Sequence, residues 1–307
     1  MVKLYKNFNL QKQHKKSIFL IGNFDGVHLG HQKLFKLAQS YKKKHKLKIG
    51  VINFDPMPKM YFNKSLKNFK ITSVHQKLKL LNQLKVDFII TKKFNKSFSK
   101  VKSINFIKEI LYKKLNCKFL FVSNNFRFGN KREGNVKELI KFESHCAYKV
   151  IKPRPLMINK KVVSSSSIRK FLQKGSLEKA KKFLNKKWTV NGIVQKGKQL
   201  GKKIGFPTAN IDIRDYVLAS PGVYAVRIIR LNGNHNYKGI ANLGYRPTFN
   251  GKKILLEVHL FNFSGNLYNK YLTVDFMKFI RKEIKFKNVD QLKKQVKSDL
   301  LRAKKIK

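Results

Sequence analysis

Residues 22–31 read Gly-Asn-Phe-Asp-Gly-Val-His-Leu-Gly-His, and this stretch decides the fold of the first half of the chain. The apolar run 17–21 before it is typical of a buried strand, and residues 31–38 after it are apolar at helical spacing. The stretch therefore connects a strand to a helix. Its glycines let backbone N–H groups approach a ligand, and the N-terminus of the helix favours an anion.

Two histidines three residues apart, His28 and His31, stand where that helix begins. Imidazole groups beside backbone N–H donors suit a phosphate that gains negative charge during a reaction. The alternative is a tight turn between strand and helix whose histidines are only surface polar groups. The spacing and the strand–turn–helix context together favour the phosphate site.

Strands and helices alternate through the rest of this half. Strands are expected at 48–54, 87–91 and 118–122, and helices at 31–44, 72–84 and 103–115. This order predicts an α/β fold with a Rossmann-like, doubly wound parallel sheet, whose ligands bind beyond the carboxyl ends of the strands. The turn at 22–31, Asp55-Pro-Met-Pro58 and Ser123-Asn-Asn-Phe126 each follow a strand. We therefore expect them to converge on one crevice.

A glycine-containing loop, residues 123–135, follows the last of these strands and carries Arg127 and Arg132. A flat ring system can stack on its Phe126 or Phe128. The alternative is an ordinary loop whose aromatic side chains belong to the core.

Four serines and an arginine, Ser164-Ser-Ser-Ser-Ile-Arg169, open a helix that ends near Gly175. Hydroxyl groups at a helix N-terminus, with an arginine in the first turns, are a second arrangement that binds phosphate. Serines that only cap the helix are the alternative.

These motifs, in this order and spacing, resemble the adenylyltransferase half of bacterial bifunctional FAD synthetases, which are His-x-Gly-His nucleotidyltransferases. The resemblance rests on four stretches, namely 22–31, Phe54-Asp-Pro-Met-Pro58, Asn125-Phe-Arg-Phe-Gly129 and 164–169. It implies that His28 and His31 contact the ATP phosphates and that the serine motif closes over the triphosphate. The residues that it implies for binding ATP and flavin are Gly22, Asn23, Phe24, Asp25, Gly30, Asn125, Arg127, Ser165, Ser166 and Arg169.

The sequence departs from the family pattern at a few positions. Ser166 stands where the family usually has Thr, and it retains the hydroxyl. Val162 replaces a common basic residue, which puts one phosphate contact in doubt, and Ser123-Asn124 replaces a frequent Gly-Asp.

The pattern changes near residue 184, where short β-rich runs separated by Gly, Pro and Asn turns begin. These runs are 189–195, 223–230, 237–243, 254–260 and 272–279. They predict a small antiparallel β-barrel, closed by a helix with Val289, Leu292, Val296 and Leu300 on one face. We expect one domain over 1–184 and a second over 185–307.

The second domain contains Gly201-Lys-Lys-Ile-Gly-Phe-Pro-Thr-Ala-Asn210. Its glycines permit a loop that covers phosphate, and Thr208 and Asn210, two apart in an extended segment, place two oxygens on one side for a hard cation. A plain Gly-Pro turn is the alternative. The nearby stretch 192–198 resembles a P-loop, but Gln199 replaces the Ser or Thr that would hold Mg²⁺, so we reject that interpretation.

Together with 240–248 and 256–260, this stretch resembles the riboflavin kinase half of the same family, so the resemblance covers nearly the whole chain. It implies that Thr208 and Asn210 hold Mg²⁺ and ATP phosphates, and that Glu257 is the base for the ribityl 5′-hydroxyl. The other binding residues that it implies are Gly201, Gly205, Pro207 and Arg281. Lys202 replaces a common arginine and loses its two-pronged donor.

Glu257 fits the role of a base on its own evidence. It is the only acidic residue between Asp215 and Asp275, and it lies in an apolar alternation where an unpaired carboxylate is costly. The alternative is a strand glutamate that faces solvent.

Composition limits the remaining classes of protein. With 307 residues, 42% of them hydrophobic, the chain can form two cores. No stretch is long and apolar enough for a membrane span or a signal peptide, so we expect a soluble cytoplasmic protein. Cys117 and Cys146 offer neither a disulfide framework nor metal-ligand spacing.

The net charge of +55 raises the possibility of nucleic-acid binding. However, both halves are basic without a concentrated stripe, and lysine greatly outnumbers arginine, which indicates compositional bias on solvated faces. We therefore expect no specific nucleic-acid partner.

The sequence thus predicts a two-domain enzyme that phosphorylates riboflavin to FMN and adenylylates FMN to FAD. ATP is the expected co-substrate and Mg²⁺ the expected metal ion. The alternatives are an adenylyltransferase for another phosphorylated substrate, with a non-catalytic barrel, and a nucleic-acid-binding protein.

Overall fold

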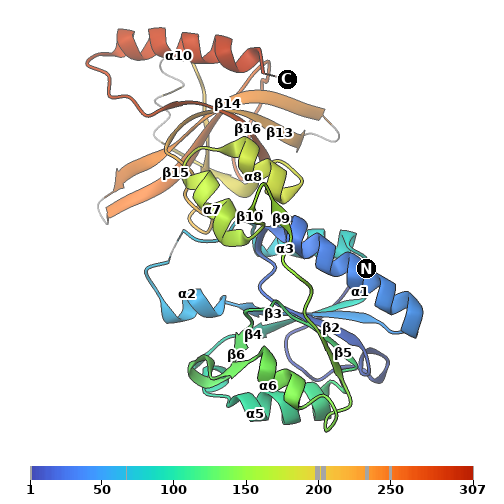
Figure 1. Ribbon diagram of the computed structural model, residues 1–307. Coiled ribbons are helices and arrows are strands. Elements are labelled where there is room, and N and C mark those ends of the chain that lie inside the picture. Colours follow the sequence, from blue (N-terminus) through green and yellow to red (C-terminus); the bar gives the residue numbers. More distant parts are fainter. Residues whose placement is uncertain are drawn as a thin grey trace. The chain divides into compact units, whose positions relative to one another are not determined.

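The computed structural model describes residues 2–66, 68–197, 201, 205–231, 235–248 and 251–306. They form two compact units (Figure 1). The N-terminal unit consists of Met1–Leu66 and Val74–Val163, and the C-terminal unit of Lys67–Ser73 and Ser164–Lys307. Lys202 and positions 198–199 of the P-loop-like stretch lie outside the described residues. Over the described ranges, no helix is long and apolar enough to cross a membrane.

The N-terminal unit is built on a parallel six-stranded sheet, as the alternation of strands and helices predicted. In spatial order its strands are β1 (Lys3–Tyr5), β4 (Phe88–Lys93), β3 (Ile49–Asp55), β2 (Ile18–Ile21), β5 (Phe119–Phe121) and β8 (Lys149–Ile151). Each neighbouring pair is parallel. The short strands β1 and β8 were not anticipated.

Helices cover both faces of this sheet, because successive side chains of each strand point to opposite sides. Ile18 and Leu20 of β2 join one core cluster with Phe35 of α1 (Leu29–His45), whereas Phe19 and Ile21 join another. The other helical segments of this unit are η1 (Lys12–His14), η2 (Asp25–Val27), α2 (Pro58–Phe62), α3 (Val74–Gln83), α4 (Lys96–Ser99), α5 (Ser103–Asn105), η3 (Phe106–Lys114), η4 (Asn130–Arg132) and α6 (Val136–Lys141). Two small hairpins, β6 (Arg127–Phe128) with β7 (Gly134–Asn135) and β9 (Met157–Ile158) with β10 (Lys161–Val162), complete it.

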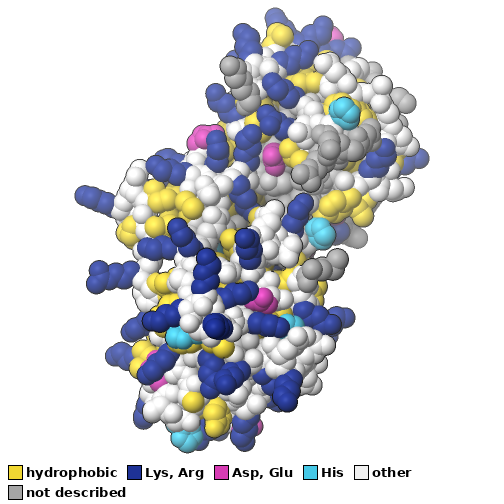
Figure 2. Space-filling view, turned by 90° about the vertical axis from the view of Figure 1, so that its right-hand side faces the viewer, with side chains coloured by type: hydrophobic (Ala, Val, Ile, Leu, Met, Phe, Trp, Pro, Cys, Tyr) yellow, Lys and Arg dark blue, Asp and Glu magenta, His cyan; other side chains and the backbone are white. Residues whose placement is uncertain are grey.

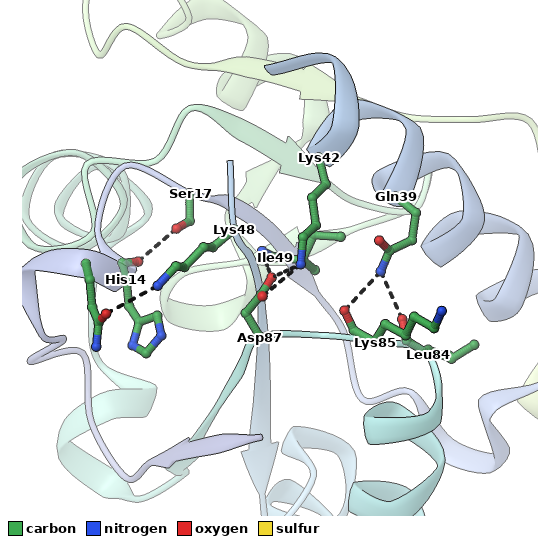
Figure 3. A network of polar contacts seen from close by, with 10 residues as sticks. His14, Ser17, Gln39, Lys42, Lys48, Ile49, Leu84, Lys85 and Asp87 are labelled. Carbon is green, nitrogen blue, oxygen red and sulfur yellow. Dashed lines mark hydrogen bonds and ion pairs between the residues drawn. The ribbon is translucent and has the colours of Figure 1, made fainter. Parts of the chain in front are cut away.

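A polar network ties the amino ends of the strands together (Figure 3). The Asp87 carboxylate lies 2.7 Å from the Lys42 ammonium and accepts a 2.7 Å hydrogen bond from the backbone N–H of Ile49. Gln39 donates to the carbonyls of Leu84 and Lys85. These contacts occupy the amino edge of the sheet, whereas ligands of doubly wound folds bind at the opposite, carboxyl edge.

The C-terminal unit contains a closed antiparallel barrel, as expected from its short β-rich runs. Around the barrel its strands are β11 (Thr189–Gln195), β12 (Ala209–Asp212), β15 (Gly251–Leu260), β14 (His235–Thr248), β13 (Gly222–Leu231) and β16 (Tyr271–Lys282). Strand β12 was expected only as an extended segment. It closes the barrel between β11 and β15.

Helix α10 (Val289–Lys304) packs on β13, β14 and β16 (Figure 1). Ala303 is buried in a cluster with Val223, and Leu300 packs against that cluster. Val289, expected on the buried face, is 54% exposed, so that part of the prediction is wrong. It is the first residue of the helix and lies beyond the barrel cluster that the later turns cover.

A segment of the first half of the sequence belongs to the C-terminal unit. Lys70 pairs with Tyr216, and the Trp188 indole donates a 3.1 Å hydrogen bond to the carbonyl of Ile71, which is fully buried. Helices α7 (Ser165–Gln173) and α8 (Leu177–Leu184) also group with this unit. A boundary at residue 184 between the two activities stays a prediction.

Candidate active sites

The turn at 22–31 connects β2 to α1, as the sequence predicted. His28 is the N-cap of α1, and its Nδ1 accepts a 3.4 Å hydrogen bond from the backbone N–H of His31. The two imidazole rings stack with their centroids 3.6 Å apart. A Cβ on Gly30 would lie 3.1 Å from the Val163 carbonyl oxygen and 3.2 Å from the His28 ring, so glycine permits this close packing.

Not every residue of this turn presents its side chain to a ligand. Phe24 is 2% exposed, joins a core cluster and contacts the His31 ring edge-on. Asp25 is also 2% exposed, and Gly22 lies under the Phe24 ring. Any contact that Phe24 makes with ATP is therefore through its backbone. The binding roles of these residues, and of Asn23, stay predictions.

A buried polar cluster stands behind the histidines. Lys77, on α3, donates to the Asn23 carbonyl at 3.3 Å and to Asn53 Oδ1 at 3.5 Å. In the described part of the chain, the buried His31 Nδ1 and Asn53 Nδ2 have no hydrogen-bond partner. Burial first, then the neighbouring His28 and Lys77, lower the pKa of His31 well below its usual 6.5. His31 is therefore neutral near pH 7, so it can meet an anion as a hydrogen-bond donor and not as a cation.

The other two strand-end loops line one cavity of about 130 Å³, but no residue of the turn at 22–31 is among its described lining residues, so the convergence of all three on one crevice stays a prediction. Phe54, Pro58 and Phe62 line it from the side of β3 and α2, and the exposed Arg127 lines it from the loop after β5. The remaining lining residues are Phe94, Phe98, Ser99, Val101, Phe106, Phe126, Phe128, Gly129, Lys131 and Arg132. Asn125 is exposed beside it and accepts a 3.0 Å hydrogen bond from the Ser123 hydroxyl.

The core interpretation of the aromatic pair in this loop holds for Phe128, whereas the stacking of a flat ring system on the pair stays a prediction. Phe128 is 8% exposed and joins the core, whereas Phe126 is half-buried, and both rings line the cavity with centroids 5.6 Å apart. Glu133 and Glu138 hold the loop on α5, because they accept hydrogen bonds of 2.6 and 2.8 Å from the Ser103 N–H and hydroxyl. The loop thus presents aromatic faces on a fixed support.

The serine motif lies at the start of α7, in the C-terminal unit. Ser164 caps the helix by accepting a 3.1 Å hydrogen bond from the Ser167 N–H, so the capping interpretation holds for this serine. Ser165 is half-buried and Ser166 is exposed. The Arg169 Nε donates to the Phe69 carbonyl at 2.7 Å, and its guanidinium lies 3.7 Å from the centre of the Phe69 ring. A phosphate role for Ser165, Ser166 and Arg169 stays a prediction.

A cavity of about 330 Å³ lies in the C-terminal unit, between barrel strands and α10. Glu257, Thr208, Gly201 and Arg281 line it, so four of the residues expected from sequence come together. The other lining residues are Phe206, Val223, Ile240, Ala241, Asn242, His259, Glu283, Ile284, Phe286, Leu292, Val296 and Asp299.

Glu257 occupies the centre of a polar row across three strands. Its register partners are Asn210 on β12 and Asn242 on β14, and register partners share a face of the sheet. Asn210 is 5% exposed, and over the described residues its Oδ1 has no hydrogen-bond partner. The segment before β12 is held by His259, whose Nδ1–H donates to the Pro207 carbonyl at 2.8 Å. Gly205 has a φ of +88°, which favours glycine.

Comparisons with known proteins agree over both halves of the chain. The FAD synthetase family model matches residues 10–167, and the riboflavin kinase model matches 184–307. A Buchnera aphidicola (Schizaphis graminum) protein named bifunctional riboflavin kinase/FMN adenylyltransferase is 41% identical over 95% of this chain and 94% of its own length. The chain belongs to this bifunctional family.

Other relatives support the same membership of the riboflavin kinase/FMN adenylyltransferase family. Proteins of that name from Haemophilus influenzae and Escherichia coli K12 are 38% and 35% identical, over 92% and 95% of this chain and 92% and 93% of theirs. A crystal structure described as a macrolide-efflux protein of Streptococcus pneumoniae matches with a TM-score of 0.85 and 26% identity, covering 100% of this chain and 99% of that one. This likeness supports the fold described above. The efflux activity is named for that protein only.

Sequence reasoning missed several polar residues of these two family sites. Lys77 and Asn53 contact each other behind the histidines, and His259 and Asp299 line the barrel cavity. Asn53 directly precedes the Phe54 motif, and His259 lies two residues after Glu257, so proximity to the motifs was a usable signal. Lys77 and Asp299 are far from any motif in the chain, and one lysine among so many carried no signal.

Proposed function

We propose that this chain phosphorylates riboflavin to FMN in its C-terminal unit and adenylylates FMN to FAD in its N-terminal unit. ATP is the co-substrate of both reactions. The observation that carries the proposal is the position of Glu257, which lines the barrel cavity with Thr208 and Arg281 in the half that matches the riboflavin kinase model. A carboxylate and a hydroxyl in one enclosed, largely apolar cavity suit transfer of a phosphoryl group to an alcohol.

In the kinase reaction, Glu257 accepts the proton of the ribityl 5′-hydroxyl. The hydroxyl oxygen then forms a bond to the γ-phosphorus of ATP, the bond from that phosphorus to the bridging oxygen breaks, and ADP leaves. A positioned general base contributes roughly a hundred- to ten-thousandfold to such a step. The half-buried setting of Glu257 excludes part of the bulk water that would compete as acceptor.

The residues near Glu257 also fit a magnesium ion. The Asn210 Oδ1, which is buried and has no hydrogen-bond partner among the described residues, and the Thr208 hydroxyl are hard oxygen donors. Mg²⁺ in kinases takes few protein ligands because phosphates and waters complete its shell. We therefore assign Thr208 and Asn210 to holding Mg²⁺. When bound, the ion neutralises charge on the ATP phosphates.

In the adenylyl transfer, a phosphate oxygen of FMN forms a bond to the α-phosphorus of ATP, and pyrophosphate leaves. His28 and His31, beside the N-terminus of α1, donate hydrogen bonds to the phosphate oxygens as charge builds up on them. No side chain needs to form a covalent intermediate, because positioning and charge stabilisation account for most catalysis of such transfers.

The aromatic cavity of the N-terminal unit is our proposed flavin site. Phe62, Phe126 and Phe128 offer faces to a flat ring system, and Arg127 supplies a cation at the rim. The cavity lies at the carboxyl edge of the sheet, where ligands of doubly wound folds bind.

One assay separates this proposal from its alternatives. The protein is incubated with riboflavin, ATP and Mg²⁺, and the flavins are separated; we expect FMN followed by FAD. FAD formed only when FMN is supplied would support an adenylyltransferase with a non-catalytic barrel. Absence of both products would reject the proposal and favour a binding protein.

On the face that Figure 2 draws, the charge pattern does not single out a nucleic-acid site. Figure 2 shows lysine and arginine side chains scattered over the whole visible face, among polar and hydrophobic ones. Nucleic-acid interfaces usually concentrate their basic residues on a patch or stripe. This pattern supports compositional bias as the origin of the charge.

A further inference from the structure

Asp299 is a buried carboxylate in the wall of the barrel cavity. It lies on α10, is 1% exposed, and has no role in the expectations drawn from sequence. The Arg281 Nε donates to its Oδ2 at 2.8 Å, and the Arg281 Nη2 lies 2.7 Å from the same oxygen. Gln295, one helical turn earlier, donates to its Oδ1 at 2.9 Å. Both carboxylate oxygens are thus engaged.

These contacts fix the orientation of the Arg281 guanidinium. One edge of the group faces Asp299, and its Nη1 donates to the Lys282 carbonyl at 2.9 Å. Only 15% of the Arg281 side chain is exposed, and the Phe286 ring centre lies 5.9 Å from the guanidinium carbon. A guanidinium has five N–H donors, so donors remain for a ligand in the cavity.

The buried Asp299–Arg281 ion pair is not explained by stability alone. Removing a carboxylate and a guanidinium from water costs free energy that their attraction often fails to return, and apolar residues in such places are frequently as stable. Here the pair joins β16 to α10 at a cavity wall whose other α10 residues, Leu292 and Val296, are apolar. These two residues and Asp299 lie at i, i+4 and i+7, on one face of the helix.

We propose that Asp299 is a positioning residue for riboflavin phosphorylation: it holds the Arg281 guanidinium at the cavity wall, where its remaining donors meet a polar edge of the flavin ring. The C-terminal helix is then part of the kinase site as well as a cover on the barrel. This inference rests on the proposed function, in which riboflavin occupies this cavity. Asp299 does not touch the substrate and acts through Arg281.

The test compares Asp299→Asn, Arg281→Gln and the double variant. Riboflavin binding is measured by quenching of flavin fluorescence, and the kinase kcat and KM are measured alongside. We expect each single variant to weaken riboflavin binding and raise its KM by roughly tenfold to a hundredfold, with kcat changed by less than about threefold. The double variant should bind no more weakly than Arg281→Gln, because Asp299 has nothing left to position.

Two controls separate positioning from loss of structure. Asp290→Asn removes an exposed carboxylate from the same helix and should leave both activities at wild-type level. FMN adenylylation by each variant reports whether the remainder of the chain is intact. If Asp299→Asn does not fold, the double variant should fold more readily, because it leaves no buried charge unpaired. Gln295→Ala removes the hydrogen bond to one Asp299 oxygen, and it should raise the riboflavin KM with kcat retained.

Each of the following results would contradict one step of the inference. Unchanged riboflavin binding by Arg281→Gln would show that Arg281 does not contact the flavin. Weaker binding by Arg281→Gln but not by Asp299→Asn would leave the proposed function intact and exclude Asp299 as the positioning residue. A further loss when Asp299→Asn is added to Arg281→Gln would show that Asp299 acts by another route. If the wild-type protein forms no FMN from riboflavin, the proposed function itself fails.

Discussion

Replacing Glu257 by Gln should remove riboflavin kinase activity and spare FMN adenylylation. The substitution retains the shape and volume of the side chain but takes away its ability to accept a proton. Glu257 lies on β15 between Asn210 and Asn242, in a barrel that the contacts assign to the C-terminal unit. The histidine turn belongs to the other unit, so an isosteric change in the barrel should not reach it.

The size of the effect follows from the role and the surroundings of the carboxylate. A positioned general base contributes roughly a hundred- to ten-thousandfold, which corresponds to about 2.7–5.5 kcal/mol of activation free energy. Because Glu257 is half-buried and Gln fills the same space, we expect the free energy of unfolding to change by less than about 1 kcal/mol. The loss should therefore appear in the kinase kcat.

The assay follows the flavins by chromatography in two reactions of the same preparation. Riboflavin with ATP and Mg²⁺ measures the kinase, and FMN with ATP and Mg²⁺ measures the adenylyltransferase. Near-wild-type kinase turnover in Glu257→Gln would show that Glu257 is not the base. A parallel loss of both activities would contradict the assignment of one site to each unit.

Four further predictions can be tested. His31→Ala should lower FAD formation from FMN roughly a hundred- to a thousandfold while riboflavin phosphorylation is retained, because a donor to the developing charge is lost; unchanged FAD formation would make the turn purely structural. Phe62→Ala should raise the KM for FMN in FAD synthesis by roughly twofold to tenfold without loss of stability, since Phe62 is 66% exposed and lines the aromatic cavity; an unchanged KM would remove Phe62 from the flavin site. Burial lowers the pKa of His31 below 6.5, so below about pH 6.5 the unfolded chain binds a proton that the folded chain does not, and the free energy of unfolding should fall as pH drops. Urea unfolding at about pH 7 and about pH 5.5 measures this slope, and His31→Gln should flatten it; an equal slope in the variant would assign the effect elsewhere. DNA and RNA should bind weakly and dissociate steeply as salt rises, and tight, selective binding at physiological salt in a filter-binding assay would contradict compositional bias.

The amino-acid sequence by itself determined the order of the elements and the place of the motifs. Hydrophobic spacing changes from strand to helix across the turn at 22–31, and β2 and α1 form on either side of it. Alternation of apolar residues likewise marked most barrel strands, because each strand buries one face. Periodicity did not reveal β1, β8 or the exposure of Val289, since very short strands and helix ends carry too few residues for a pattern.

Only the tertiary structure decided which distant residues meet. Arg169 stacks on Phe69, a hundred residues earlier in the chain, and Ile71 is buried in the unit of the barrel. Lys77 reaches Asn53, and Asp299 reaches Arg281, although nothing in their local sequence marks them as polar partners. The physical reason is that spacing along the chain controls local backbone hydrogen bonding, whereas a buried charge is tolerated only where the packed fold supplies its partner.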